Sequence, residues 1–212
     1  MSLSEKKERL IKEEWANFTA VHNEGGRASC QDDPETFFIM RRSQFVCWDE
    51  DLIDSWYNDL TDARMQRRNL LSEKYAWMMK QTAPAEFEKI KKFLPVLSSD
   101  DEQLIDDIVK IEVFWMEQYA QKYPYMAEGN REIHSYEDSE YSTSFETYLR
   151  GELHTYSHNT LTLYADMVKK LEKEGKSMSL MIMDAMVKSY GYKDIDDAER
   201  QQKIRAVNNI NL

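Results

Sequence analysis

The residue types best suited to chemistry are concentrated between residues 22 and 33, in the run HNEGGRASCQDD. Its two adjacent glycines allow positive φ angles and let the backbone approach a ligand closely. The planar guanidinium of Arg27 carries five donors that suit a carboxylate or a phosphate. Cys30 lies just before the predicted start of a helix, where the helix dipole favours a thiolate. The loop is therefore predicted to bind a small anionic molecule through Asn23, Glu24, Arg27, Cys30 and Gln31.

The same residues can also be explained without a ligand. Gly25 would end one helix, and Asp33 would cap the next one. Glu24 would pair with Arg27, and Cys30 would be a small buried side chain. The sequence leaves both interpretations open, and it also leaves open whether Glu24 or Cys30 would give the pocket an enzymatic activity.

Two carboxylates fall on helix faces that are otherwise apolar. Glu112 shares its face with isoleucine, valine and tryptophan side chains, and Glu152 shares its face with aromatic and leucine side chains. A carboxylate in such surroundings should have either a cationic partner or a raised pKa. Arg64 and Arg67, near the apolar stripe of the third predicted helix, are the candidate partners. We therefore include Glu112 and Glu152 among the predicted ligand-binding residues, with a structural salt bridge that fixes helix register as the alternative.

His154 and His158 are four residues apart, so on a continuous helix both imidazoles would lie on one face. This spacing could seat zinc or nickel if His22 or His134 supplied a third ligand from another helix. It resembles the HxxxH element of the DinB-like metal-dependent helical bundles. HxxxH arises easily by chance, and neither HExxH nor the ferritin-like ExxH occurs. No metal ion and no other cofactor is therefore predicted, and partial burial of the two rings between helices explains them as well.

Composition limits both the fold and the partners. The chain has 212 residues, of which only six are glycine and four are proline, so it cannot form the many tight turns of a β-sandwich or barrel. Its 42% apolar and 32% charged residues fit long amphipathic helices. The net charge of −11 would repel a phosphate backbone, so no nucleic-acid binding is expected. Because no run of 18 apolar residues occurs and the chain has only two cysteines, we expect a cytoplasmic protein that does not enter a membrane.

Apolar residues recur with the 3.6-residue period of helices along nearly the whole chain. The sequence therefore predicts helices over residues 4–21, 34–48, 49–83, 84–94, 99–122, 143–174 and 177–190, with a weaker one after residue 194. Ser99–Glu102 and Thr143–Glu146 have the pattern of capping boxes, and residues 125–142 form the longest predicted loop. The predicted fold is an all-α bundle of about six to eight helices that forms one domain over residues 1–212.

Two stretches indicate a different class of function. Residues 178–186 contain four methionines, and the loop at 125–142 is acidic and rich in tyrosine. Either stretch could contact a partner protein or a second copy of this chain. The alternative to a ligand pocket is therefore a non-catalytic interaction module, for example a homodimer, and a DinB-like metal-dependent bundle is the second alternative.

Three runs of the sequence resemble a known family. NEGGRASCQDD at residues 23–33, TFFIMRRSQF at 36–45 and ETYLRGEL at 146–153 are similar to the bacterial family called domain of unknown function 4125. The resemblance extends over most of the chain, from Trp15 through the helix after Thr143. It implies a soluble bacterial protein, and because no activity is assigned to the family, no catalytic residue is carried over.

Overall fold

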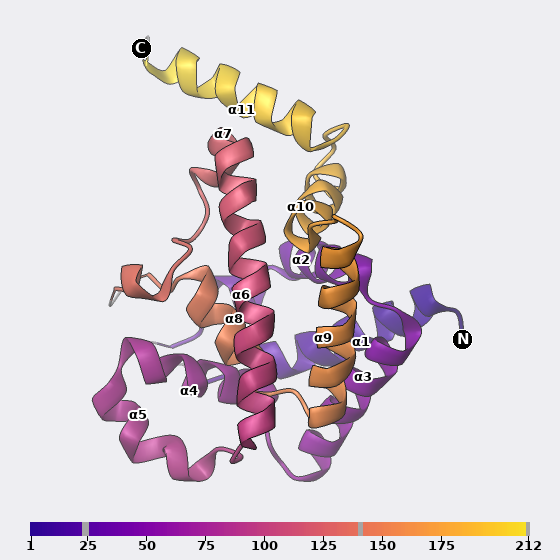
Figure 1. The fold of residues 1–212 in the computed structure, drawn as a ribbon, viewed down its shortest axis with the longest axis vertical. Coiled ribbons are helices and arrows are strands. Elements are labelled where there is room, and N and C mark those ends of the chain that lie inside the picture. The colour runs from indigo at the N-terminus through magenta and orange to yellow at the C-terminus, as the bar shows by residue number, and fades with distance from the viewer. Residues whose placement is uncertain (23–25, 140–141, 211–212) are drawn as a thin grey trace.

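The computed structural model describes residues 1–22, 26–139 and 142–210, with side chains up to residue 208. Within these ranges the chain forms eleven α-helices and no β-strand (Figure 1). The predicted all-α class is confirmed, whereas the predicted count of six to eight helices is too low. The helices are α1 (Leu3–Thr19), α2 (Pro34–Gln44), α3 (Glu50–Met65), α4 (Leu70–Thr82), α5 (Pro84–Ile90), α6 (Ser99–Lys122), α7 (Pro124–Ala127), α8 (Phe145–Leu153), α9 (His158–Lys173), α10 (Met178–Ser189) and α11 (Ile195–Ile210).

The long helix predicted over residues 49–83 is in fact two helices, α3 and α4. Arg67 lies in the tight turn between them and has a left-handed φ of 59°. Asn69 then caps α4, because its side-chain oxygen accepts hydrogen bonds from two backbone N–H groups of the first turn, at 3.0 and 3.1 Å. The apolar stripe continues across this break, so periodicity alone does not reveal it.

The helix predicted over residues 143–174 is likewise two helices, α8 and α9. Ser157 is the N-cap of α9, and its hydroxyl accepts from the Thr160 N–H at 3.3 Å. The Asp59 carboxylate on α3 accepts from the Ser157 N–H at 3.0 Å and from the Thr160 hydroxyl at 2.6 Å. A side chain from another helix therefore stabilises the break, and the local sequence does not contain this information.

The predicted capping boxes begin one residue away from the observed N-caps. α6 is capped by Ser98 rather than Ser99, and α8 is capped by Ser144 rather than Thr143. In both places two hydroxyl residues are adjacent, and either type can cap a helix. The local pattern therefore specifies these helix starts only to within one residue.

α6 and α9 lie side by side along the molecule, and both begin at the same end, where a ring nitrogen of His158 lies 2.6 Å from a carboxylate oxygen of Asp101 (Figure 1). α1 and α3 lie on one side of this pair, and α4, α5 and α8 lie on the other. Aliphatic side chains of α1, α3, α6 and α9 fill the centre between them. The almost fully buried members are Leu10, Ile11, Leu52, Ile53, Ile105, Ile108, Leu161 and Val168.

α8 approaches α4 more closely than a side chain at position 151 would allow. A Cβ atom added to Gly151 would lie 2.9 Å from the carbonyl oxygen of Lys74 and 2.6 Å from the Cγ atom of Met78. Real Cβ atoms essentially never come that close to a neighbouring atom. Gly151 therefore permits the close contact that brings the next residue, Glu152, beside Lys74.

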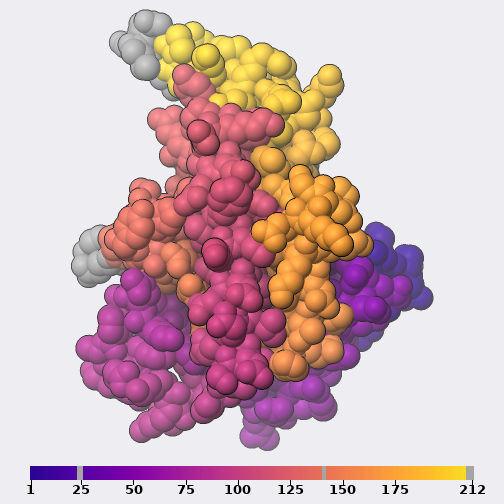
Figure 2. All heavy atoms as spheres, viewed as in Figure 1, coloured from indigo at the N-terminus to yellow at the C-terminus, as the bar shows by residue number. Residues whose placement is uncertain are grey.

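The C-terminal helices form a smaller cluster at one end of the molecule. Its buried side chains come from α6, α10, α11 and the junction before α7: Tyr119, Tyr123, Val187, Ile195 and Ala198. α11 extends across this end, beyond the body formed by the other helices (Figure 2). None of the described helices combines the length and the apolar character needed to cross a membrane.

Candidate functional site

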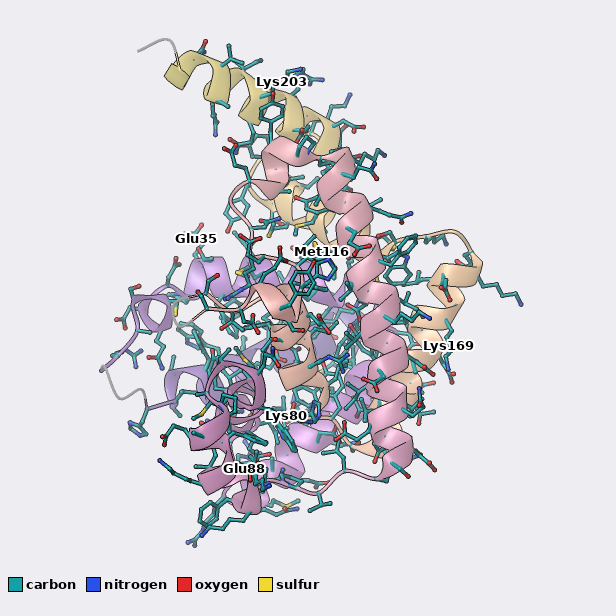
Figure 3. All side chains as sticks on the ribbon, turned by 60° about the vertical axis from the view of Figure 1, so that its left-hand side comes forward. Glu35, Lys80, Glu88, Met116, Lys169 and Lys203 are labelled. Carbon is teal, nitrogen blue, oxygen red and sulfur yellow. The ribbon has the colours of Figure 1, made fainter. Side chains whose placement is uncertain are left out.

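A cavity of about 560 Å³ lies between α1, α2, α3, α4 and α8. We call it the aromatic cavity, because its wall is mostly aromatic and aliphatic: Phe18, Phe37, Met40, Trp56, Leu60, Leu70, Leu71, Tyr75, Met78 and Tyr148. Four exposed lining residues mark its mouth: Cys30, Asp33, Met40 and Arg131. The cavity lies on the side of α6 that α2 and α4 occupy. Figure 3 shows this side by the labelled residues Glu35 of α2 and Lys80 of α4, whereas Lys169 of α9 lies on the other side of α6. Small-molecule sites typically occupy about 300–1,000 Å³, and this cavity falls within that range.

Four charged side chains form a network at the floor of the aromatic cavity. Arg41 of α2 donates two hydrogen bonds to Glu14 of α1, at 2.7 and 2.5 Å, and one to Glu152 of α8 at 3.3 Å. Lys74 of α4 donates to the other carboxylate oxygen of Glu152 at 2.5 Å. We call these four residues the floor network. Its two carboxylates balance its two cations, so the floor carries no net charge.

Two neutral donors complete the floor network. The indole N–H of Trp56 donates to Glu14 at 2.8 Å, and the hydroxyl of Tyr156 donates to Glu152 at 3.1 Å. Burial alone would raise the pKa of Glu152, but the Lys74 ammonium and the Arg41 guanidinium lower that pKa to about 2. Glu152 is therefore ionised and paired at neutral pH, which makes it a poor proton acceptor. This floor supports ligand binding more directly than acid–base catalysis.

Lys74 and Tyr75 keep hydrogen-bond donors that a ligand could use. Lys74 is 3% exposed, and Glu152 is the one described residue to which it donates a hydrogen bond. Its Nζ atom also lies 3.5 Å from the centroid of the Tyr148 ring. Since an ammonium has three N–H groups, two form no hydrogen bond in the described part of the chain, and the Tyr148 ring can take one of these. The Tyr75 hydroxyl has no hydrogen-bond partner in the described part of the chain, and burial raises its pKa, so it stays protonated.

Part of the predicted loop reaches the aromatic cavity. Cys30 and Asp33 lie at the mouth. Asp33 caps α2 as expected, with its carboxylate accepting from the Thr36 N–H at 3.0 Å, whereas Cys30 is exposed rather than a buried side chain. Asn23 and Glu24 lie outside the described residues, so the structure does not place them.

Arg27 and Gln31, the other two predicted residues of the loop, do not line the cavity. Arg27 donates to Asp32 at 2.7 Å and to the backbone carbonyls of Thr19 and Gln31. Gln31 is 1% exposed, and its side-chain amide donates to two carbonyls near the end of α1. Both side chains hold the loop against α1, and thereby position Cys30 and Asp33.

Glu112 and Glu152 are both inward-facing, as predicted, but Glu112 does not line the aromatic cavity. Glu112 is 4% exposed, and the Tyr164 hydroxyl donates to it at 2.8 Å. Burial raises the pKa of Glu112 to about 8; the hydrogen bond from Tyr164 opposes this shift, and the negative charge of Glu152 adds to it. Glu112 is therefore a protonated acid at pH 7, whereas Glu152 is an ionised carboxylate.

The predicted cationic partners of these carboxylates are wrong. Arg64 pairs with Glu13 at the surface, at 3.1 Å, and Arg67 lies in the turn before α4. Arg41 and Lys74 bind Glu152 instead, from helices that are distant in sequence. The helical period shows which face a residue occupies, but the packing of the helices decides which faces meet.

Glu112→Gln is expected to remove a pH dependence of stability between pH 5 and pH 8. The folded-state pKa of about 8 lies above the ordinary value of 4.5. The stabilising contribution of the protonated group is therefore fully present below pH 4.5 and is lost as the pH rises through 8. Relative to the variant, the wild-type free energy of unfolding should fall by roughly 1.4 kcal/mol per pH unit in this window. Urea denaturation of both proteins across the window measures this difference, and a constant difference would contradict the assignment.

The predicted histidine pair does not share a helix face, because the break between α8 and α9 separates the two residues. His154 is 6% exposed, and its ring packs on that of Trp77 with centroids 4.4 Å apart. His158 is exposed at the start of α9, and His134 pairs with Glu117 at 3.1 Å. In the described ranges, no group of three or more His, Cys, Asp and Glu side chains could hold a metal ion.

Comparison with known sequences tests the family resemblance. A profile of the family described as "Protein of unknown function (DUF4125)" matches residues 5–200, nearly the whole chain. The chain belongs to this family. It matches no curated protein sequence and no solved structure. Of the three runs that carry the resemblance to DUF4125, the first two are nearly contiguous and the third begins only at residue 146. Each of them contributes residues to the aromatic cavity: Cys30 from the first, Arg41 from the second and Glu152 from the third.

Four charged residues of this DUF4125 site are not among the predicted residues: Glu14, Arg41, Lys74 and Arg131. Arg41 lies within one of the family runs, so the runs themselves were an available signal for it. Lys74 stands on the buried face of α4, and Arg131 stands in a predicted loop; neither belongs to a motif. Only the packing of α4 and α8, and the path of the chain before α8, bring them to the cavity.

Proposed function

We propose that this chain binds a small anionic molecule with an apolar body in the aromatic cavity. The observation that carries this proposal is an aromatic wall that leads from the exposed Arg131 guanidinium at the mouth to a buried Lys74 ammonium with unused donors. Buried polar groups without partners are costly, so donors in such a place favour a ligand that supplies an acceptor. Cys30 is exposed at the mouth and could react with a bound molecule, which makes a covalent reaction the next question once a ligand is known.

A substitution that narrows the mouth of the aromatic cavity tests the proposal. Anilinonaphthalene sulfonate (ANS) is a suitable probe, because it combines aromatic rings with an anionic sulfonate. Met40→Trp should weaken ANS binding at least tenfold, since Met40 is an exposed residue of the mouth and an indole would fill the entrance. Isothermal titration calorimetry gives the affinity and stoichiometry without interference from the added tryptophan.

The matched control is Met65→Trp. Met65 is 71% exposed at the end of α3 and does not line the aromatic cavity, so this variant should bind one ANS with the wild-type affinity. Circular dichroism should show the same helix content in all three proteins. Equal ANS affinity of the Met40→Trp variant and the wild type, or no ANS binding by the wild type, would exclude this cavity as the binding site.

A further inference from the structure

We infer that the ligand of the aromatic cavity binds with its anionic group at the mouth, on Arg131, and with a neutral hydrogen-bond acceptor at the floor. The inference rests on the proposed function and goes further, because it fixes the orientation of the ligand and its chemical class. It depends on the difference between the floor, where carboxylates already balance the cations, and the mouth, where the charge of Arg131 has no carboxylate partner in the described ranges.

The floor is unsuited to an anion. Glu14 and Glu152 already share the charges of Arg41 and Lys74, and the Lys74 ammonium is 2.5 Å from Glu152. A ligand anion at this depth would be a third negative charge facing two cations, away from water. Burying such an uncompensated charge is strongly unfavourable. A carbonyl, ether or hydroxyl oxygen adds no charge and can accept from an unused donor of Lys74.

The mouth, unlike the floor, is suited to an anion. Arg131 is exposed and lines the cavity, and it donates one hydrogen bond, from Nη1 to the Thr143 carbonyl at 3.1 Å. Its guanidinium carbon lies 4.8 Å from the centroid of the Tyr148 ring, which fixes the group beside the opening. The remaining donors of Arg131 have no partner in the described part of the chain. A guanidinium in this position can bind a carboxylate, sulfonate or phosphate through two parallel hydrogen bonds.

Asp33 is the other charged residue at the mouth. Its carboxylate accepts from the Thr36 N–H at 3.0 Å and so serves as the N-cap of α2. The positive end of the α2 dipole offsets its charge locally. Arg131 thus keeps donors for a ligand, since its one hydrogen bond in the described ranges goes to the Thr143 carbonyl, whereas Asp33 is engaged in capping α2.

These charges define a class of ligand. It has an anionic group at one end, an aromatic or alicyclic body that fits between Phe37, Trp56 and Tyr75, and a neutral oxygen at the other end. Hydroxylated or acylated aromatic carboxylates and aryl phosphate esters have this form. A molecule with anionic groups at both ends is excluded by the paired carboxylates of the floor.

Two probes with similar aromatic rings test the orientation. ANS carries a sulfonate, and phenylnaphthylamine (NPN) is its uncharged counterpart. Arg131→Gln should weaken ANS binding about tenfold, because it removes a charge-assisted hydrogen bond, and should leave NPN affinity within about twofold. Arg64→Gln is the matched control, since Arg64 is exposed and does not line the cavity; it should leave the affinity for both probes unchanged. Unchanged NPN binding also shows that the variants are folded.

The outcomes separate the two proposals. If the wild type binds neither probe, the proposed function fails. If the wild type binds both probes and Arg131→Gln changes neither affinity, the cavity binds ligands but the anionic group does not lie on Arg131, and the inference is overturned. Equal weakening of ANS and NPN by Arg131→Gln would also overturn it, because the arginine would then act through the shape of the mouth and not through its charge.

Discussion

Arg41→Met is expected to lower the free energy of unfolding by about 3–5 kcal/mol at pH 7. Arg41 is the one residue of the floor network that contacts both Glu14 and Glu152. Burial alone would lower the pKa of Arg41, but the two carboxylates raise it overall, so the guanidinium is charged at every accessible pH. Methionine fills a similar volume and supplies no charge. It would therefore leave Glu14 with the Trp56 indole alone and Glu152 with one cation.

Guanidinium chloride denaturation followed by circular dichroism measures this loss. Arg42→Met is the control on the same helix, because Arg42 is exposed and pairs with Glu8 at the surface. Its loss should cost less than about 1 kcal/mol. The cost of Arg41→Met should also shrink as the pH falls below the ordinary glutamate pKa, because Glu152 without the guanidinium can take up a proton more readily. Similar costs for the two substitutions at pH 7 would show that the floor network contributes little to stability.

Gly151→Ala is expected to destabilise the protein, although the same change within a helix is normally stabilising by about 1 kcal/mol. The added Cβ would lie 2.9 Å from the Lys74 carbonyl oxygen. That atom belongs to the backbone of α4, so the contact can be relieved only if the two helices move apart. Overpacking of this kind costs about 1–3 kcal/mol, and the movement would also separate Lys74 from Glu152. We therefore expect a net loss of about 1–2 kcal/mol together with weaker ANS binding.

Thermal and chemical denaturation of Gly151→Ala and Gly129→Ala test this expectation. A Cβ at Gly129 meets no atom within 4 Å, so that variant should have nearly wild-type stability and wild-type ANS affinity. Stabilisation of the protein by Gly151→Ala would mean that α4 and α8 are not packed as closely as the structure has them.

The helical period in the sequence predicts the fold class well and the helix boundaries poorly. Amphipathic stripes identify the long helices, because burial of one face is what makes such a segment stable. The loop predicted over residues 125–142 is wrong at its start, because the short helix α7 covers Pro124–Ala127. The helix breaks at Arg67 and before Ser157 depend on capping and on contacts with other helices, and not on the apolar stripe. The first depends on a cap by Asn69 within a continuous stripe, and the second depends on Asp59 of another helix. The local sequence indicates both breaks only weakly, through the N-cap residues Asn69 and Ser157, and it does not indicate the contribution of Asp59 at all.

For the candidate site, too, the sequence does not show which residues of other helices a side chain contacts. A carboxylate on an apolar face must either find a cation or take up a proton, and the two predicted carboxylates show one outcome each: Glu152 is paired, and Glu112 has a raised pKa. The sequence predicts that each carboxylate has one of these two outcomes, but it does not show which one, because the cations that pair with Glu152 come from other helices. The prediction that His154 and His158 share a helix face is wrong for a related reason, since it requires a continuous helix and the chain breaks before α9.

The floor network also bears on how the protein folds. Its central anion, Glu152, is separated by 111 residues from Arg41 and by 78 from Lys74, so the network closes only after most of the chain has assembled. Contacts of such long range form late and slow the search for the native state. Until α8 docks, Lys74 lacks its carboxylate partner and Arg41 keeps only Glu14, beside an apolar wall that is still incomplete. The proposed ligand binding would thus be coupled to the assembly of the whole bundle, and a bound molecule would protect against global unfolding rather than against local fraying.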